Sequence, residues 1–243
     1  MKGVGVFLSV DSFMTPRLLT VAKMVKNSKT LADIGTDHAY IPVYLVMNDI
    51  IDSAIAMDVN VGPLNKACEN IDKFSLKHKI KTRLSDGLSE LEDGEADTVV
   101  IAGMGGVLIN KILENDKERL NSVKTYILQP MTAIYETRKY LAENGFLIID
   151  EALAKEEDKI YTIIKAEKGN MNIASEIGYY VGDCLTRNKD QYLNEYLDGK
   201  IYEYEKAVSS MKNTKNEETK KKAVYFEYIL KEFKRIKGEC AKW

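Results

Sequence analysis

Acidic side chains and glycines recur where four predicted strands end. Asp33 and Gly35 close the first strand, Asp58 the second, Asp86 the third, and the run Ala-Gly-Met-Gly-Gly at 102–106 the fourth. In a doubly wound parallel sheet the carboxyl ends of the strands meet along one edge, where ligands bind. Glycine there lets the backbone approach a ligand, and a carboxylate attracts a cation or accepts hydrogen bonds from hydroxyl groups. The pattern therefore predicts a ligand site along this edge.

The turn after the first strand sets the charge of this site. A dinucleotide fold carries three glycines there, so that the backbone can approach a pyrophosphate, whereas this turn has Gly35 alone, bracketed by Asp33 and Asp37. Two carboxylates repel a diphosphate, but they suit the sulfonium and ammonium groups of S-adenosylmethionine. The charge favours a methyltransferase over a dehydrogenase. Thr36 and His38 share the turn and are predicted to line the cofactor pocket, although a histidine taken alone is more often buried or helix-capping.

The second and third strand ends are predicted to complete the cofactor pocket. Asp58 follows the apolar strand next after the first turn, which fits a carboxylate that grips ribose hydroxyls. In isolation such an acid is more often a solvated strand end or a helix cap. Val59 stands beside it, and Asp86 with Gly87 closes the third strand. Asp86 also suits the N-cap of a helix that starts at Gly87, and the two roles are compatible.

Alternating strands and helices must position these residues. The predicted strands are 31–34, 53–58, 80–84, 97–102, 126–128, 146–149 and 161–166, and the predicted helices are 41–49, 62–78, 107–120 and 132–144. A further helix, with Thr15 as N-cap and Pro16 in its first turn, is expected to run towards Asn27 over the sheet edge or the ligand mouth. The alternation indicates a parallel α/β sheet with helices on both faces, and the last two strands predict an antiparallel insertion at one edge.

The pattern changes after Gly169, where no strand signal returns. Apolar residues fall on one helix face at positions 193, 197, 201, 204, 208 and 211, and again at 223, 226, 230 and 233. A polar break at 212–218 separates the two stripes. Two such helices predict an antiparallel helical pair. The expected domains are therefore 1–168, which binds the cofactor, and 169–243, a helical coiled-coil domain.

Composition restricts the class of protein. The chain has 243 residues, 45% hydrophobic and 30% charged, with a net charge of −2, which does not indicate a polyanion partner. The three cysteines, Cys68, Cys184 and Cys240, are too far apart for a disulfide framework or a zinc site, so we expect no metal and a reducing cytoplasm. The opening residues 1–13 have only Lys2 as a basic flank, and neither a signal peptide nor a membrane span is expected.

Several blocks together resemble one family, the bacterial tRNA (adenine-22-N1)-methyltransferases. The similar blocks are Asp-Ile-Gly-Thr-Asp-His-Ala-Tyr-Ile-Pro at 33–42, Gly-Pro at 62–63, Asp-Gly-Leu at 86–88, Ile-Ala-Gly-Met-Gly-Gly at 101–106 and Ile-Leu-Gln-Pro at 127–130. The resemblance implies a Rossmann-like class I methyltransferase domain, S-adenosylmethionine as methyl donor, and a C-terminal coiled-coil domain used on tRNA. One departure is Met131, where we expect asparagine after Gln129 and Pro130.

Methyl transfer to adenine N1 would make modest demands on the protein. The N1 lone pair is free at neutral pH, so the reaction needs positioning more than proton removal. The product ring is cationic until its exocyclic amine loses a proton, so acceptors for that amine and negative potential near the ring are useful. The carbonyls of Ala102 and Gly103 are the candidate acceptors, Gly105 allows the base to approach, and Asp37 is the candidate for the negative potential. A tight strand-to-helix connection is the alternative explanation of the glycines.

Two other functions stay open at this point. The near-neutral charge favours a nucleotide-binding interaction module without turnover, whose helical pair binds a protein. A methyltransferase for a small metabolite would need a lid over the pocket, and no lid segment is apparent between the strands. The set of motifs favours the tRNA methyltransferase.

Overall fold

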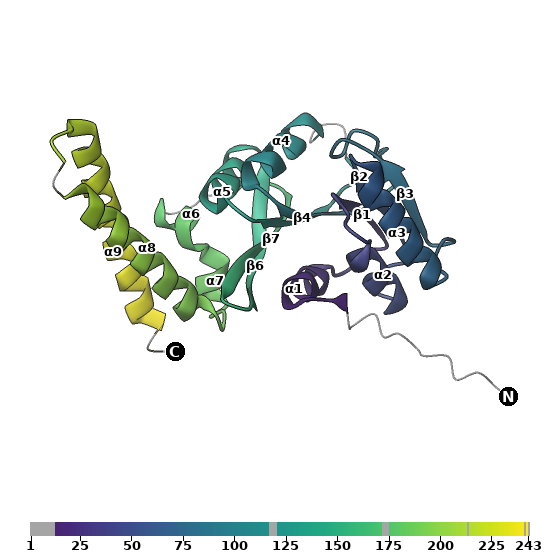
Figure 1. Ribbon diagram of the computed structural model, residues 1–243, viewed down its shortest axis with the longest axis horizontal. Helices are drawn as coiled ribbons and strands as arrows, with labels where there is room; N and C mark the ends of the chain where they lie inside the picture. The colour runs from purple at the N-terminus through teal and green to yellow at the C-terminus, as the bar shows by residue number, and fades with distance from the viewer. Residues whose placement is uncertain (1–12, 117–120, 172–174, 213, 241, 243) are drawn as a thin grey trace.

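The computed structural model of the chain describes residues 13–116, 121–171, 175–212, 214–240 and 242. Within these ranges one sheet of seven strands has the order β3-β2-β1-β4-β5-β7-β6 (Figure 1). Strands β3, β2, β1, β4 and β5 run parallel, whereas β7 is antiparallel to both β5 and β6. The predicted antiparallel insertion is confirmed. The strands are β1 (Thr30–Ile34), β2 (Ser53–Asp58), β3 (Ile80–Leu84), β4 (Thr98–Met104), β5 (Thr125–Pro130), β6 (Phe146–Glu156) and β7 (Lys159–Lys168).

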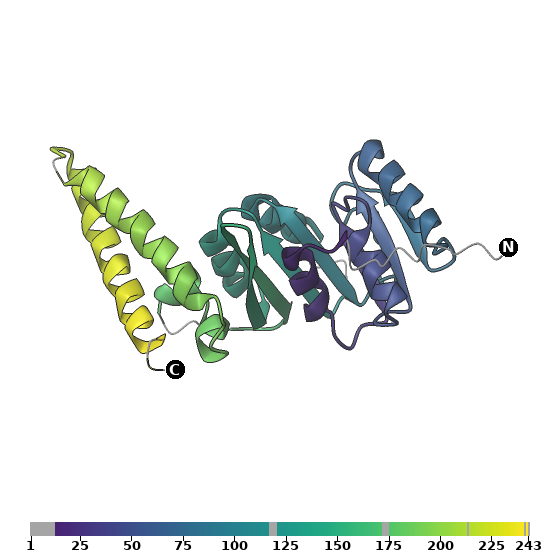
Figure 2. The same cartoon turned by 60° about the horizontal axis from the view of Figure 1, so that its bottom comes forward.

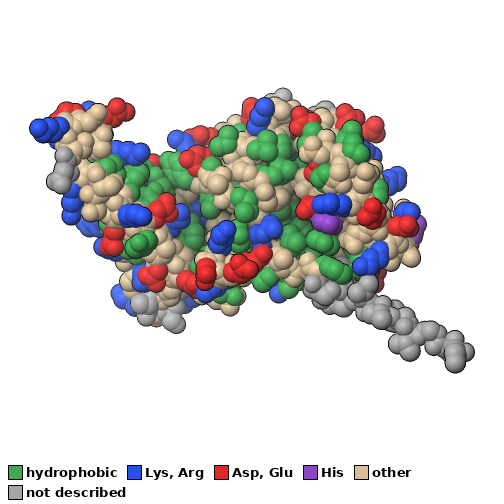
Figure 3. Space-filling view, viewed as in Figure 1, with side chains coloured by type: hydrophobic (Ala, Val, Ile, Leu, Met, Phe, Trp, Pro, Cys, Tyr) green, Lys and Arg blue, Asp and Glu red, His purple; other side chains and the backbone are tan. Residues whose placement is uncertain are grey.

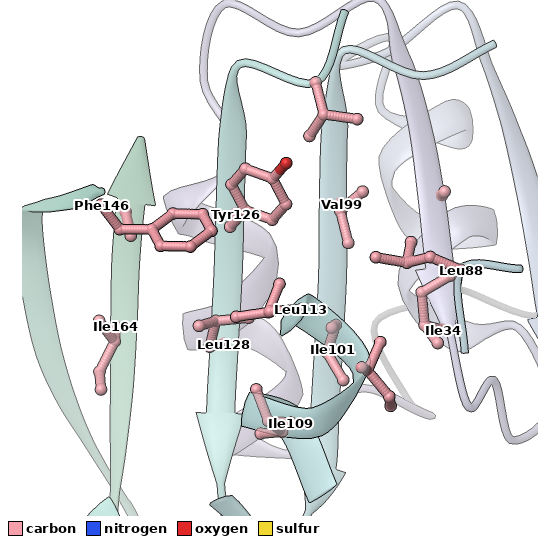
Figure 4. Close-up of a cluster of buried hydrophobic side chains, with 14 of the residues drawn as sticks. Ile34, Leu88, Val99, Ile101, Ile109, Leu113, Tyr126, Leu128, Phe146 and Ile164 are labelled. Carbon is pink, nitrogen blue, oxygen red and sulfur yellow. The ribbon is translucent and has the colours of Figure 1, made fainter. Parts of the chain in front are cut away.

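Helices cover both faces of the sheet, as the alternating pattern predicted. One face carries α1 (Pro16–Met24), α2 (Tyr40–Met47) and α3 (Val61–Lys73), and the other carries α4 (Gly106–Asp116) and α5 (Ile134–Glu143). Side chains of successive strand residues point to opposite faces of the sheet. Val100 of β4 packs on the α1–α3 side, while Ile101 packs with Ile109 and Leu113 of α4 and Leu128 of β5 (Figure 4). Burial of each such side chain contributes roughly 1.5–3 kcal/mol to stability.

Several element ends differ from the prediction. The N-cap of α1 is confirmed, because Thr15 Oγ1 accepts a hydrogen bond from the Leu18 N–H at 3.4 Å. Helix α3 ends at Lys73 instead of residue 78, because Ser75 adopts a left-handed backbone with φ of 58° and breaks the helical ladder. Strand β4 runs on to Met104, inside the glycine run. The predicted end of the fourth-strand helix at residue 120 lies outside the described residues.

The last two strands are longer than their apolar runs, which ended at residues 149 and 166. Strands β6 and β7 pair from Phe146 with Lys168 to Glu156 with Lys159 and form a long hairpin. Glu157, with φ of 54°, makes the turn. The hairpin contains charged residues because β6 is the edge strand and one of its sides is unpaired.

The C-terminal part is helical, as predicted, and its two long helices pack as a pair. They stand away from the sheet and lie side by side (Figures 1 and 2). Leu193, Leu197 and Val208 are buried as expected, but the second helix buries Ile229, Phe233 and Ile236, so its apolar face is only partly the predicted one. The short helices were not predicted. No helix in the described ranges has the length and apolarity to cross a membrane. The helices are α6 (Ile177–Val181), α7 (Asp183–Arg187), α8 (Leu193–Met211) and α9 (Glu217–Cys240).

A buried ion pair joins the sheet to the short helices. Arg138 of α5 and Glu151 of β6 pair at 2.7 Å with both side chains 1% exposed. The Arg138 guanidinium also donates to the backbone carbonyls of Tyr179, Tyr180 and Val181 at 3.0 to 3.1 Å. These bonds satisfy carbonyls that the short helix α6 leaves without helical partners. Arg138 therefore fixes where the chain leaves the sheet for the α8–α9 pair.

Candidate functional site

A cavity of about 390 Å³ opens at the carboxyl ends of β1 and β4. This volume is within the range of small-molecule sites, roughly 300–1,000 Å³. Six of the predicted site residues line it, namely Asp33, Gly35, Thr36, Asp37, Ala102 and Gly103. Strands β1 and β4 are neighbours in the sheet, so the first turn and the glycine run meet there. The structure thus brings the cofactor candidates of the first turn together with the candidates for the methyl-transfer step.

The first turn is held in a conformation that favours glycine at position 35. Gly35 has φ of 71°, which residues with side chains rarely adopt, and a Cβ there would meet the end of the Met104 side chain. Its N–H and that of Thr36 both donate to the carbonyl of Met57, at 2.8 and 2.9 Å. The turn from β1 is thereby tied to β2 and pressed against the end of β4. The backbone of the turn is therefore fixed beside the cavity before any ligand arrives.

Asp33 has the most strongly perturbed carboxyl group of the cavity. Burial raises its pKa to about 6, the nearby Thr36 hydroxyl lowers it, and the negative charge of Asp58 raises it. Thr36 Oγ1 is itself buried and has no partner with hydrogen-bond geometry. A buried carboxyl group and a buried hydroxyl without a partner are costly unless a ligand satisfies them. This pair therefore fits a ligand that carries a positive charge and hydrogen-bond donors.

Asp37, in the same turn, differs from this buried pair because its side chain is exposed. Its side chain is 71% exposed, and Asp37 Oδ1 is 3.5 Å from His38 Nε2. His38 itself does not line the cavity. Its ring stacks on Tyr40 at 5.1 Å, and its backbone carbonyl accepts a hydrogen bond from Asn70 Nδ2 at 2.8 Å. His38 therefore supports the turn, whereas Asp37 is accessible to a ligand in the cavity.

The remaining cofactor candidates lie along the same edge, outside the cavity. Asp58 Oδ1 accepts a hydrogen bond from the Asn60 N–H at 2.7 Å, and the Asp58 carbonyl accepts one from the Ser85 N–H at 2.9 Å. The second bond places the end of β3, with Asp86 and Gly87, next to the end of β2. Val59 is exposed beside Asp58. These residues form a rim that continues from the cavity towards β3.

Gln129 controls the backbone of the glycine run. The register between β4 and β5 is interrupted between Ala102 and Met104, so Gly103 has no partner in the ladder. Instead, the Gly103 N–H donates to Gln129 Oε1 at 3.1 Å, and Arg17 Nη1 of α1 donates to the same oxygen at 2.8 Å. Gln129 is fully buried. Its side chain therefore replaces a backbone partner and fixes Gly103, whose φ is 80°.

The last two glycines of the run, Gly105 and Gly106, differ in whether packing requires glycine at their position. A Cβ on Gly106 would lie 2.6 Å from the carbonyl oxygens of Thr132 and Ala133, so this position needs glycine for packing alone. A Cβ on Gly105 would come no closer than 3.3 Å to Thr132 Oγ1. The tight strand-to-helix connection is therefore correct for Gly106. Gly105 lies beside the cavity without lining it.

Comparisons with known proteins decide the family. A model of the family described as tRNA (adenine(22)-N(1))-methyltransferase matches residues 31–233. The chain belongs to this family. A tRNA (adenine(22)-N(1))-methyltransferase of Bacillus subtilis (strain 168) is 38% identical over 182 residues, which are 73% of this chain and 76% of the relative. The resemblance of the motif blocks is thereby confirmed.

Solved structures of relatives agree with the fold of this methyltransferase. A putative tRNA (m1A22) methyltransferase from Streptococcus pneumoniae, in complex with S-adenosyl-L-methionine, has a TM-score of 0.81 and 32% identity, with 90% of this chain and 99% of that chain covered. A relative from M. capricolum in complex with S-adenosyl-homocysteine has a TM-score of 0.76 and 31% identity, with 94% of this chain and 98% of that chain covered. The Rossmann-like class I fold with its helical C-terminal part is thus confirmed.

Helix α1 supplies methyltransferase cavity residues that the sequence did not reveal. Thr15, Arg17 and Leu18 line the cavity from above the strand ends, together with Phe13 and Tyr40, whose rings stack at 5.8 Å. Arg17 Cζ lies 5.5 Å from the centre of the Tyr161 ring, and Arg17 Nε lies 3.9 Å from Glu156 Oε2. No motif marks Phe13, Thr15, Arg17 or Leu18, although α1 was expected over the sheet edge or the mouth, whereas Tyr40 belongs to the 33–42 block. In the described ranges, no group of three or more His, Cys, Asp or Glu side chains is placed to hold a metal ion.

Proposed function

We propose that the cavity between β1 and β4 holds the methyl donor and the target adenine together. The protein is an S-adenosylmethionine-dependent tRNA adenine-N1 methyltransferase that acts at position 22. The observation that carries the site is the meeting of the first turn and the glycine run in one cavity. Because the chain belongs to a family of tRNA methyltransferases, the alternative of an interaction module without turnover is not favoured. The alternative of a methyltransferase for a small metabolite is not favoured for the same reason.

The acidic residues of the cavity and of the rim suit the charge of the donor. S-adenosylmethionine, when bound, supplies a methyl group on a positively charged sulfur. Asp33 and the unpartnered Thr36 hydroxyl would hold its amino acid end, because the ammonium group satisfies both. Asp58 would bind the ribose hydroxyls, and Val59, Asp86 and Gly87 would flank the adenine. Gly35 and His38 keep the turn in place for these contacts.

The glycine run would hold the target base. As the N1 lone pair forms the new N–C bond, the S–C bond breaks, and its electron pair stays on sulfur. The adenine ring then becomes positively charged. The carbonyls of Ala102 and Gly103 would accept hydrogen bonds from the exocyclic amine, and Gly105 leaves room for the ring. The exposed carboxylate of Asp37 would stabilise the charge that develops on the ring.

Replacing Asp37 by asparagine tests this assignment. We expect kcat for tRNA methylation to fall by roughly ten- to a hundredfold, because a preformed charge near the developing cation is lost. Affinity for S-adenosylmethionine should change less than about threefold, since the donor amino group lies with Asp33. Single-turnover methylation and calorimetry measure the two quantities. Asp49→Asn, at an exposed acid after α2, is the matched control. An unchanged kcat in Asp37→Asn would remove Asp37 from the mechanism.

We further propose that two parts of the chain bind the two substrates. Residues 1–168 would bind the donor, and residues 169–243 would engage the tRNA. The buried contacts of Arg138 with α6 support a fixed arrangement of the two parts. A cytoplasmic location is part of this proposal, because the substrate is tRNA.

A further inference from the structure

A second, larger groove lies between the start of α5 and the α8–α9 pair. Its volume is about 540 Å³, and it is lined by Tyr135, Tyr180, Tyr204 and Phe226. We call it the aromatic groove. The surface is hollowed between the helical pair and the sheet, with hydrophobic side chains along the hollow (Figure 3). None of the roles assigned above uses these side chains.

One wall of the aromatic groove is bonded to the glycine run. Met131 lines it, and the Met131 N–H donates to the Met104 carbonyl inside the glycine run at 2.8 Å. Thr132, which also lines the groove, accepts a hydrogen bond from the Gly106 N–H at 3.0 Å. One wall of the groove is therefore built from residues bonded directly to the loop that would hold the target adenine. A chain of nucleotides entering the cavity has this groove beside it.

The aromatic rings of the groove are spaced as a series. Ring centroids are 4.5 Å apart for Tyr135 and Tyr180, 6.2 Å for Tyr180 and Tyr204, and 4.9 Å for Tyr204 and Phe226. All four side chains line the groove and are half-buried. Exposed aromatic faces in a groove are the means by which proteins bind unpaired bases, since every base has a π-face.

The charge of the groove favours bases over phosphates. Lys200 lines the groove, but its Nζ pairs with Glu203 at 2.9 Å, and Glu136 adds a further acid. Lys222 Nζ lies 5.3 Å from the centre of the Phe226 ring. The groove itself is thus close to neutral, and a cation stands at its aromatic end. A phosphate backbone would gain little inside, whereas an uncharged base could stack there.

We propose that the aromatic groove binds unstacked nucleotides of the tRNA that flank the target adenine. This proposal rests on the proposed function, because it takes the target base to lie at the glycine run. N1 is on the pairing edge, so the base must leave its stacked or paired position to react. Its neighbours then lose stacking partners, and the rings of the groove replace them. The groove would thereby favour the extruded state of the RNA over the folded one.

The test replaces Tyr204 and Phe226 by leucine in the full-length protein. Leucine keeps an apolar side chain but removes the ring face. Affinity for unmodified tRNA should fall at least tenfold, and by the same factor at low and at moderate salt, because no phosphate contact is lost. KM should rise with kcat nearly unchanged. Affinity for S-adenosylmethionine should stay within threefold, which shows that the donor-binding part is folded, and an unchanged helical circular dichroism signal should show that the α8–α9 pair is folded.

Matched controls stand on the same two helices. Tyr202→Leu and Tyr228→Leu remove exposed rings outside the groove and should leave tRNA affinity within threefold. Phe226→Trp restores a ring face and should retain wild-type affinity. The groove proposal would be wrong if tRNA affinity fell equally in the control variants, if it did not fall in the Tyr204 and Phe226 variant, or if Phe226→Trp failed to retain wild-type affinity. If the wild type methylates tRNA and only these results fail, the proposed function stands. If the wild type leaves position 22 unmethylated, the proposed function itself is wrong.

Discussion

Asp33→Asn should abolish measurable S-adenosylmethionine binding and yet leave the ligand-free protein at least as stable as the wild type. Burial holds the pKa of Asp33 at about 6, above its ordinary value of 3.8. The folded state therefore binds more protons than the unfolded state between these values, and stability falls as pH rises from about 4 to 6. The shift corresponds to a cost of about 3 kcal/mol at pH 7. A neutral amide avoids this cost but offers no charge to the donor.

Calorimetry and urea unfolding between about pH 5 and 8 measure both halves of this prediction. Wild-type affinity for the donor should decline below about pH 6, because protonation removes the charge of Asp33. In Asp33→Asn no donor binding should be measurable at any pH in this range. Asp52→Asn, at an exposed acid before β2, should behave as the wild type in both experiments. Tight donor binding by Asp33→Asn would contradict the role of Asp33 in holding the donor.

Gln129→Leu should lower kcat for tRNA methylation at least a hundredfold. The substitution leaves the Gly103 N–H and one Arg17 donor without the acceptor that they share, the oxygen of the fully buried Gln129 side chain. An unsatisfied buried donor costs about 1–3 kcal/mol, and because both of these bonds are only partly buried we expect a stability loss at the lower end of that range. Loss of the bond also frees Gly103, and a displacement of about 1 Å at a reacting group can reduce the rate a hundredfold.

A conservative variant separates positioning from simple destabilisation. Gln129→Glu keeps an oxygen acceptor for both donors, although it loses the Gln129 Nε2 donor to the Pro130 carbonyl, and it should recover part of the rate lost in Gln129→Leu. Gln191→Leu, at an exposed glutamine before α8, should leave kcat unchanged. Single-turnover methylation with bound donor provides the rates, and urea unfolding provides the stabilities. A Gln129→Leu enzyme with a normal rate would show that the glycine run needs no such support.

The core of the fold was predictable because its signals are local. Apolar runs of strand length alternate with helical patterns, and a glycine or an acidic residue stands where each of the first four strands ends. The short helices α6 and α7 carry no such pattern. They are placed by Arg138 and Glu151, which lie far from them in sequence and meet them only in the folded chain. The long β6–β7 hairpin was underestimated because charged residues interrupt its apolar alternation.

The site was predictable to the extent that it lies on strand ends. The first turn and the glycine run meet because β1 and β4 are neighbours, which the doubly wound order implies. Arg17 and Tyr40 were missed as cavity residues because their place depends on how α1 and α2 pack over the edge. Gln129 belonged to a recognised motif, but its bond to Gly103 follows from an irregular register that no sequence pattern announces. The roles assigned to the individual residues stay predictions.

Mapping the methylated nucleotide in unmodified tRNA tests the central claim most directly. An N1 methyl group blocks the pairing edge of adenine, so reverse transcription stops at the modified position. Incubation of the protein with tRNA and S-adenosylmethionine should produce one strong stop at adenine 22, and Asp33→Asn should remove it. A stop at another nucleotide, or none on any tRNA while the donor binds normally, would contradict the account.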